Sequence, residues 1–144
     1  MRRLRVGAAL VPRLLGLAAC QGGEPALSVP TATLDAALSC PASFTSERQP
    51  VLLVHGTFVT PEENWSWNYG RALPARGYDV CTVRLPARAT GDIQVASEYV
   101  VHAVRRIAAQ SGGKVDVLGH SQGGLEPAGP CGGGPACASR STTS

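Results

Sequence analysis

The chain has 144 residues, enough for one compact domain and no more. Its formal net charge is +3, but four of the thirteen basic residues are arginines that precede Cys20. Beyond that point nine basic residues face ten acidic ones, so the positive balance belongs to a leader and gives no support for nucleic-acid binding. No stretch of the sequence is long and apolar enough to be a permanent membrane span.

Residues 1–20 are predicted to be a signal peptide. A basic start is followed by a mostly apolar run, and small residues precede Cys20, as in a cleavage site. The closing Leu-Ala-Ala-Cys also resembles a bacterial lipobox, after which the cysteine becomes N-terminal and is acylated. Two interpretations stay open: an ordinary signal peptide and an extracellular product, or a cell-surface bacterial lipoprotein with membrane anchoring through Cys20.

Residues 21–49 are predicted to be a linker and N-terminal extension. Gln21 to Pro25 has the composition of a tether, Thr31 to Leu38 is weakly helical, and Pro41 to Pro50 is polar and loop-like. The partial domain proper is expected to cover residues 50–125.

Val51 to Val54 is a continuous apolar run, which predicts a strand covered on both faces of a parallel sheet. His55-Gly56-Thr57 follows at once. In hydrolases that carry a nucleophile elbow, this place supplies an oxyanion donor. Thr57 is the expected donor, and an ordinary turn residue is the alternative. His55 is expected to be a structural histidine that braces the loop.

Thr60-Pro61-Glu62-Glu63 predicts a capping box at the start of a helical segment that reaches Arg76, is interrupted by Pro74 and is stopped by Gly77. We expect Trp65 and Trp67 to be packing residues rather than walls of an acyl pocket. Tyr78 to Leu85 reads as the next strand.

A long helix is predicted from a cap at Thr90-Gly91-Asp92 to Ser111, ended by Gly112-Gly113. Four apolar residues recur at helical spacing and are expected to face the sheet: Ile93, Val100, Val104 and Ile107. Three polar residues are expected on the solvent side: His102, Arg105 and Arg106.

The apolar run from Val115 to Leu118 predicts a buried strand, and it leads directly into Gly119-His120-Ser121-Gln122-Gly123. This G-x-S-x-G pattern is typical of a nucleophile elbow, in which Ser121 sits on a strained strand-to-helix turn and the glycines let neighbouring backbone approach. A polar turn after a core strand is the alternative. The order of strands and helices predicts an α/β fold: a truncated α/β-hydrolase fold, with a parallel sheet core and a nucleophile elbow.

Several segments together resemble the extracellular triacylglycerol lipases related to Candida lipase B, and bacterial class 2 lipases have similar segments. The likeness covers about Cys40 to Leu125, and the segments that carry it are Pro50 to Thr57, Asn64-Trp65, Gly77-Tyr78, Cys81, Glu98 to Val101 and His120 to Leu125.

The resemblance implies carboxylic ester hydrolysis on an ester or lipid substrate. It implies Ser121 as nucleophile, Thr57 and Gln122 as oxyanion donors, and a disulfide between Cys40 and Cys81. It implies no metal or organic cofactor, and the sequence predicts no protein partner. Acyl transfer to an alcohol uses the same serine and is not distinguished.

The pattern breaks after Leu125. Seven of the nine residues from Pro127 to Pro135 are Gly or Pro, which predicts a disordered tail over residues 126–144. A shift of reading frame near Leu125 would produce this change of composition. A metal site at Cys131 and Cys137 is not expected, because no other ligands accompany them.

Family members carry the catalytic acid and histidine after the nucleophile. Here no Asp or His follows Ser121, and Glu126 is the one later carboxyl side chain. The sequence therefore predicts an impaired lipase or esterase. The alternative is a non-catalytic, lipid-anchored surface protein that keeps a hydrolase-like scaffold.

Overall fold

The computed structural model describes residues 26–125 and 137–138. The predicted signal peptide with Cys20, the predicted tether and most of the predicted tail lie outside these residues. The elements in chain order are α1 (Thr31–Ala36), β1 (Leu38–Ser39), β2 (Val51–Val54), α2 (Pro61–Trp65), α3 (Tyr69–Ala72), the 3-10 turn η1 (Pro74–Arg76), β3 (Val80–Val83), the turn η2 (Pro86–Ala89), α4 (Ile93–Ser111), β4 (Val115–Gly119), the turn η3 (Ser121–Gly124) and β5 (Cys137–Ala138).

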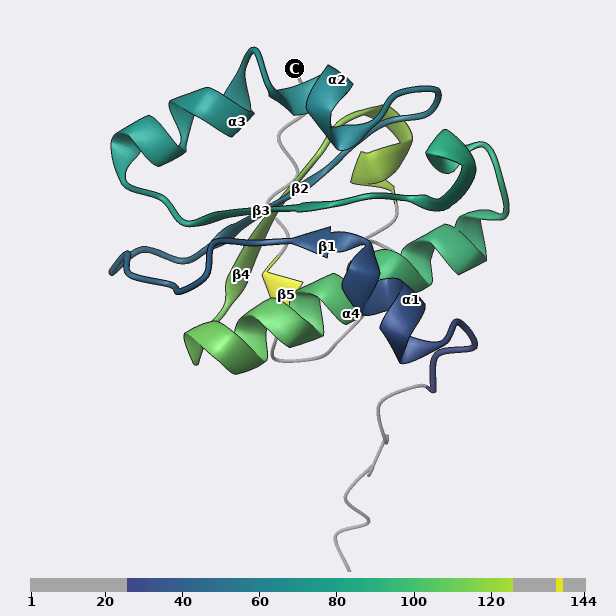
Figure 1. The fold of residues 1–144 in the computed structure, drawn as a ribbon, viewed down its shortest axis with the longest axis horizontal. Helices are drawn as coiled ribbons and strands as arrows, with labels where there is room; N and C mark the ends of the chain where they lie inside the picture. The colour runs from purple at the N-terminus through teal and green to yellow at the C-terminus, as the bar shows by residue number, and fades with distance from the viewer. Residues whose placement is uncertain (1–25, 126–136, 139–144) are drawn as a thin grey trace, which may run out of the picture.

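One sheet runs through the middle of the molecule in the order β1-β3-β2-β4-β5 (Figure 1). Strands β2, β3 and β4 are parallel, with Leu52 opposite Cys81 on one side and Val117 on the other. The predicted parallel core is therefore confirmed. The sheet as a whole is mixed, because β1 pairs with β3 in the antiparallel sense.

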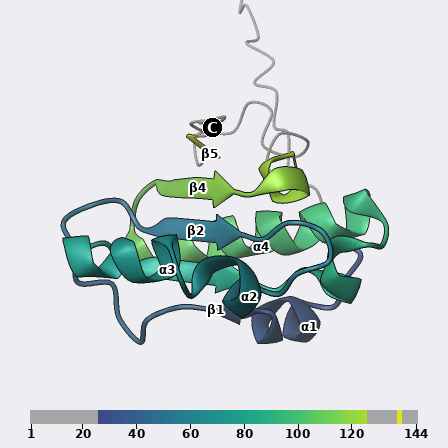
Figure 2. The ribbon, with the colours of Figure 1, turned by 90° about the horizontal axis from the view of Figure 1, so that it is seen from above.

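Helices cover both faces of this sheet (Figures 1 and 2). Under α4 and α1 lies the larger core cluster, which includes Leu52, Val54 and Ile107. On the opposite face Trp65 of α2 packs with Val51 and Leu53 of β2. All four residues of β2 are buried, as the continuous apolar run predicts.

The segment before β2 contributes to the fold, although the sequence assigns it to a linker and extension. Leu34 of α1 is 2% exposed within the core, and β1 adds a strand to the sheet. Because α1 lies against α4, His102 is only 13% exposed and contacts Asp35 at 2.7 Å. The prediction that His102 faces solvent is therefore wrong.

Helix ends follow the sequence signals closely. The capping box at Thr60 and Glu63 is present, Asp92 caps α4, and Gly112 ends α4 in the left-handed conformation at φ 71°. Val100, Val104 and Ile107 are buried as predicted, but Ile93 at the first helical position is 45% exposed. No helix among the described residues is long and apolar enough to cross a membrane.

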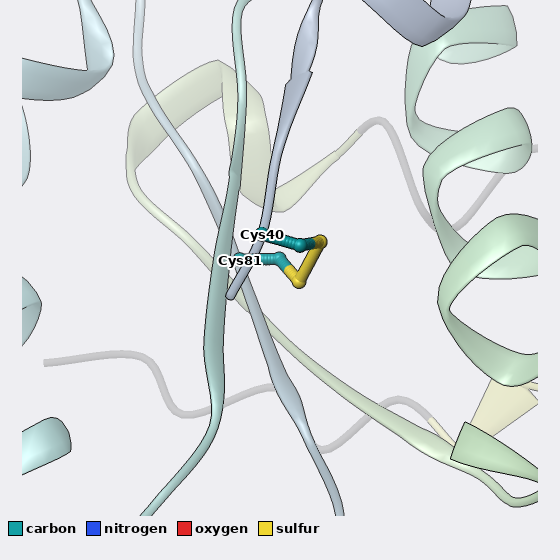
Figure 3. The surroundings of a disulfide bond; sticks show 2 residues. All are labelled: Cys40 and Cys81. Atoms are coloured by element: carbon teal, nitrogen blue, oxygen red, sulfur yellow. A yellow bond between two sulfur atoms is a disulfide. The ribbon is translucent and has the colours of Figure 1, made fainter. Parts of the chain in front are cut away.

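A disulfide joins Cys40, just after β1, to Cys81 in β3 (Figure 3). Its two cysteines are the pair that the resemblance implies. The bond closes a loop between positions 41 residues apart and ties the N-terminal segment to the sheet.

At the other edge, Cys137–Ala138 forms a two-residue parallel strand beside Val115 and Asp116 of β4. These residues fall inside the segment for which the sequence predicts a disordered tail. The unpaired N–H and C=O groups along the edge of β4 provide the partner.

Glu98 of α4 fastens the start of the described chain. Its carboxylate accepts hydrogen bonds from the hydroxyl and the amide of Ser28, both at 2.7 Å, and from the amide of Val29 at 2.8 Å. The hydroxyl of Ser28 and then the amide of Val29 lower the pKa of Glu98.

A carboxyl group whose pKa is lower in the folded state stabilises the fold above its unfolded pKa, and this contribution is lost as the pH falls through the folded value. We therefore expect parent and Glu98→Gln to differ in unfolding free energy at neutral pH and to converge well below pH 4.5. Urea denaturation of both proteins measures this difference. A constant difference at every pH would contradict the expectation.

Candidate active site

The nucleophile elbow has the geometry that its sequence pattern predicts. β4 ends at Gly119, and Ser121 follows with φ 54°, a left-handed conformation that non-glycine residues rarely adopt. Ser121 is exposed. The described chain continues as the short turn η3, so the serine sits at the start of a turn directly after a core strand.

The two glycines of the motif are required by close backbone contacts. A Cβ at Gly119 would collide with the carbonyl group of Gly123, 2.5 Å from its carbon. A Cβ at Gly123 would lie 2.5 Å from the carbonyl oxygen of Val54 and 2.6 Å from that of His55. The elbow therefore folds back onto its own strand and onto the end of β2.

The loop after β2 meets the elbow through the two predicted oxyanion donors. The hydroxyl of Thr57 donates a hydrogen bond to Oε1 of Gln122 at 2.6 Å. The structure thus brings together two residues that are 65 positions apart in the chain. Their role as oxyanion donors stays a prediction.

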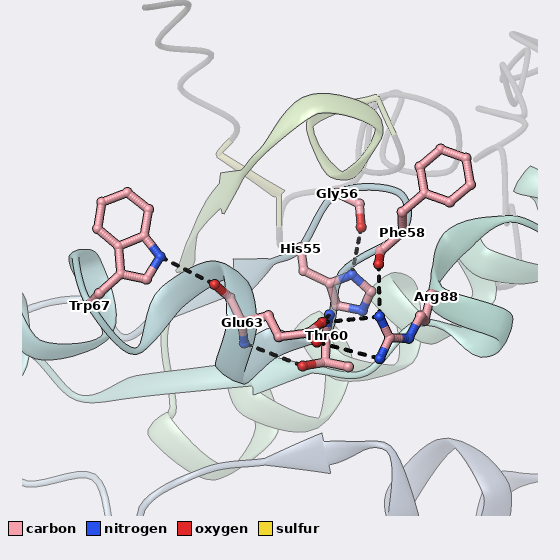
Figure 4. A network of polar contacts seen from close by, with 7 residues as sticks. All are labelled: His55, Gly56, Phe58, Thr60, Glu63, Trp67 and Arg88. Carbon is pink, nitrogen blue, oxygen red and sulfur yellow. Dashed lines mark hydrogen bonds and ion pairs between the residues drawn. The ribbon is translucent and has the colours of Figure 1, made fainter.

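His55 braces this loop from below. It is fully buried, its Nε2 accepts the amide hydrogen of Leu85 at 3.0 Å, and its Nδ1 lies 2.8 Å from the carbonyl oxygen of Gly56 (Figure 4). Since Nε2 accepts, Nδ1 carries the hydrogen and donates it. Burial lowers the pKa of His55, which keeps the ring neutral. Its position matches the structural role that the sequence predicts.

Asn64 of α2 lies between the loop and the elbow, and it is only 8% exposed. Its Oδ1 accepts a hydrogen bond from the amide of Gly56 at 3.1 Å. The same oxygen lies 3.0 Å from Nδ1 of His120, the residue before the nucleophile. One side-chain oxygen therefore contacts both halves of the site.

The outer side of the loop is held by Arg88. Its carbonyl oxygen accepts the amide of Phe58 at 2.9 Å, and its guanidinium donates to the carbonyl oxygen of Phe58 at 3.0 Å (Figure 4). The guanidinium also contacts the carboxylate of Glu63 at 3.3 Å. Phe58 has φ 70°, and Ala87, Arg88 and Ala89 are all left-handed. Such a run costs roughly 1–2 kcal/mol per residue, so the contacts must offset it.

Each of the three histidines of the sequence has a hydrogen-bond partner other than Ser121. His55 is bonded to Leu85 and Gly56, His102 contacts Asp35, and His120 contacts Asn64. Glu126 lies outside the described residues. In the described part of the chain, none of these hydrogen bonds joins a histidine to Ser121.

A groove of about 770 Å³ opens beside the serine. Its walls include Ser121, Trp65, Trp67 and Leu118. Trp65 is 4% exposed and packs in the core as predicted. Trp67 is 73% exposed, so the prediction of a packing role is wrong for this residue. Trp67 lies between α2 and α3, where the predicted helical segment is interrupted.

Comparison with known proteins identifies the family. Residues 51–140 match the model of the alpha/beta hydrolase family. The chain is 41% identical over 106 residues to lipase B of Pseudozyma antarctica, an alignment that covers 72% of this chain and 31% of that protein. The crystal structure of Aspergillus fumigatus lipase B matches with a TM-score of 0.67 at 34% identity, over 85% of this chain and 29% of that one.

This chain belongs to the alpha/beta hydrolase family, and it is a relative of the fungal B lipases. The resemblance drawn from the sequence is confirmed. The chain spans about a third of the length of these relatives.

Two residues at the site were not predicted. In the sequence, Asn64 stood out only as part of Asn64-Trp65, one of the segments that carry the family resemblance. Nothing in that pair of residues indicates a contact with His120. Arg88 had no local signal, because its partner Phe58 lies 30 residues earlier in the chain.

Proposed function

We propose that the site is the nucleophile half of a carboxylic ester hydrolase, a lipase or esterase acting on triacylglycerols or other esters. The proposal is supported above all by one observation: Ser121 stands exposed at φ 54° on a groove, beside Thr57 and Gln122, which are hydrogen-bonded to each other. Strain of this kind at an exposed serine is typical of a nucleophile that must project from its backbone.

In the proposed reaction Oγ of Ser121 attacks the ester carbonyl, and its proton passes to a general base. The alcohol leaves, and water then releases the acid from the acyl-enzyme. The backbone N–H groups of Thr57 and Gln122 stabilise the negative oxygen of the intermediate. The three histidines contact other groups, so no general base is assigned. We propose that hydrolysis by Ser121, Thr57 and Gln122 alone is impaired for this reason.

The same partnering of the histidines favours a second candidate function. In that case the chain is a non-catalytic surface protein that keeps the scaffold for binding. We also propose export of the chain through its leader, to the exterior or to the cell surface with Cys20 acylated. Mass spectrometry of the mature N-terminus distinguishes a free from an acylated cysteine.

Hydrolysis of p-nitrophenyl butyrate by the parent and by Ser121→Ala tests the catalytic proposal. We expect a slow rate in the parent that falls to the uncatalysed background in the variant, because no other group replaces the hydroxyl. Equal rates in the two proteins would reject an active enzyme and favour the binding scaffold. Circular dichroism of both proteins confirms that they have the same fold.

A further inference from the structure

We infer that Asn64 is a positioning residue of this site. Its side-chain oxygen fixes the loop after β2, which contains Gly56 and Thr57, relative to the elbow. The inference rests on the proposed function for its catalytic consequence. Its structural content stands by itself: Oδ1 is shared between the amide of Gly56 and the imidazole of His120.

The chemistry of the partners fixes the direction of both hydrogen bonds. A backbone amide only donates, so the atom of Asn64 that faces Gly56 is its oxygen. An amide oxygen only accepts, so His120 must donate from Nδ1. The arrangement therefore selects the Nδ1–H tautomer of His120 and sets the plane of its ring.

The positions of these partners explain why the contact matters. Gly56 immediately precedes Thr57, and His120 immediately precedes Ser121. A Cβ on Gly56 would lie 2.9 Å from Nδ1 of His120 and 3.1 Å from Cβ of Ser121, so the two segments already touch. The Asn64 oxygen holds them at this separation, from a helix whose start is fixed by a capping box.

Asn64 is itself well fixed. Its backbone amide donates to the backbone carbonyl oxygen of Thr60 at 3.0 Å, and its backbone carbonyl oxygen accepts a hydrogen bond from the side chain of Asn68 at 3.0 Å. The single side chain of Asn64 therefore contacts both Gly56 and His120 from a fixed position. A substitution that removes its oxygen affects both halves of the site at once.

Nuclear magnetic resonance of the full chain tests the inference without reference to catalysis. The ring nitrogen shifts of His120 should report the Nδ1–H tautomer in the parent. In Asn64→Leu, which keeps the branched shape of the side chain and removes the oxygen, the shifts should move toward the Nε2–H form that predominates in free histidine. Hydrogen exchange of the Gly56 amide should become about tenfold faster, as expected for one lost hydrogen bond.

Asn64→Asp retains an acceptor oxygen at the same place and should keep both the tautomer and the slow exchange, which also covers the case in which the leucine variant does not fold. Gln110→Leu is the control, because it removes a carboxamide that is exposed near the end of α4, away from Gly56 and His120. The β2 amides serve as the internal reference for exchange. An Nε2–H tautomer in the parent, or unchanged Gly56 exchange in Asn64→Leu, would overturn the inference.

The ester assay then tests the catalytic consequence. We expect kcat for Asn64→Leu to fall about tenfold with little change in KM, and Asn64→Asp to restore most of it. If the parent itself shows no hydrolysis dependent on Ser121, the proposed function fails while the tautomer and exchange results still decide the role of Asn64. If hydrolysis is present but unaffected by both variants, the positioning role is rejected and the proposed function survives.

Discussion

Gly123→Ala is expected to lower the unfolding free energy by about 3 kcal/mol or more and to remove any hydrolysis that depends on Ser121. The added methyl would lie 2.5 Å from the carbonyl oxygen of Val54 and 2.6 Å from that of His55. Both contacts are with backbone, so no flexible side chain can turn away.

The backbone carbonyl oxygen of Val54 also accepts a hydrogen bond from the elbow. It accepts the amide of His120 at 3.0 Å, which joins the end of β2 to the elbow. If the methyl pushes β2 and the elbow apart, this hydrogen bond lengthens and the contact between Thr57 and Gln122 is lost. Stability and site geometry should therefore fail together.

Gly91→Ala is the matched control, since a Cβ at Gly91 meets nothing within 4 Å and its backbone is not left-handed. Urea denaturation should place this control within about 0.5 kcal/mol of the parent. If Gly123→Ala is as stable as Gly91→Ala, the close backbone packing at the elbow is wrong.

Elements whose signals are local were predicted well from the sequence. The capping box at Thr60, the cap at Asp92, the left-handed Gly112 and the elbow glycines each depend on a few neighbouring residues, and the structure has all of them. Residue type predicts such features, because only certain side chains cap a helix end or tolerate a crowded turn.

The packing of the N-terminal segment could not be predicted from local sequence signals. The stretch containing α1 has weak helical character and no strong apolar periodicity, so nothing local indicates that Leu34 is buried in the core or that β1 pairs with β3. Both contacts join parts of the chain that are far apart. The position of His102 was then predicted wrongly because the packing of this weakly helical segment against α4 was not foreseen.

The site divides in the same way. Ser121, Thr57 and Gln122 were predicted from motif and resemblance. Of the groups that support them, His55 was predicted, whereas Asn64 and Arg88 were not. Asn64 contacts His120 across 56 positions, and Arg88 contacts Phe58 across 30. The left-handed conformations of Ala87 and Arg88 leave no mark on the sequence, because neither residue type favours that region.

Loss of the Cys40–Cys81 disulfide is expected to lower the unfolding free energy by about 3–4 kcal/mol. The bond spans 41 positions, and in the chain-entropy model a cross-link of this length removes much of the freedom of the unfolded chain. This amount is a large share of the roughly 5–15 kcal/mol typical of whole domains. It is important here because α1 and β1 are short elements, of six and two residues.

The measurement must separate the cross-link from the packing of the cysteines. Cys81 is fully buried, so replacing it with alanine removes core volume as well as the bond. Reduction leaves both sulfur atoms in place, and the difference between the oxidised and reduced parent in urea therefore isolates the cross-link. The double variant Cys40→Ala/Cys81→Ala should be less stable still, by the cavity cost, and insensitive to reductant. Equal stability of the oxidised and reduced parent would contradict this expectation and show that noncovalent contacts, such as those of β1, Leu34 and Glu98, hold the N-terminal segment in place without the cross-link.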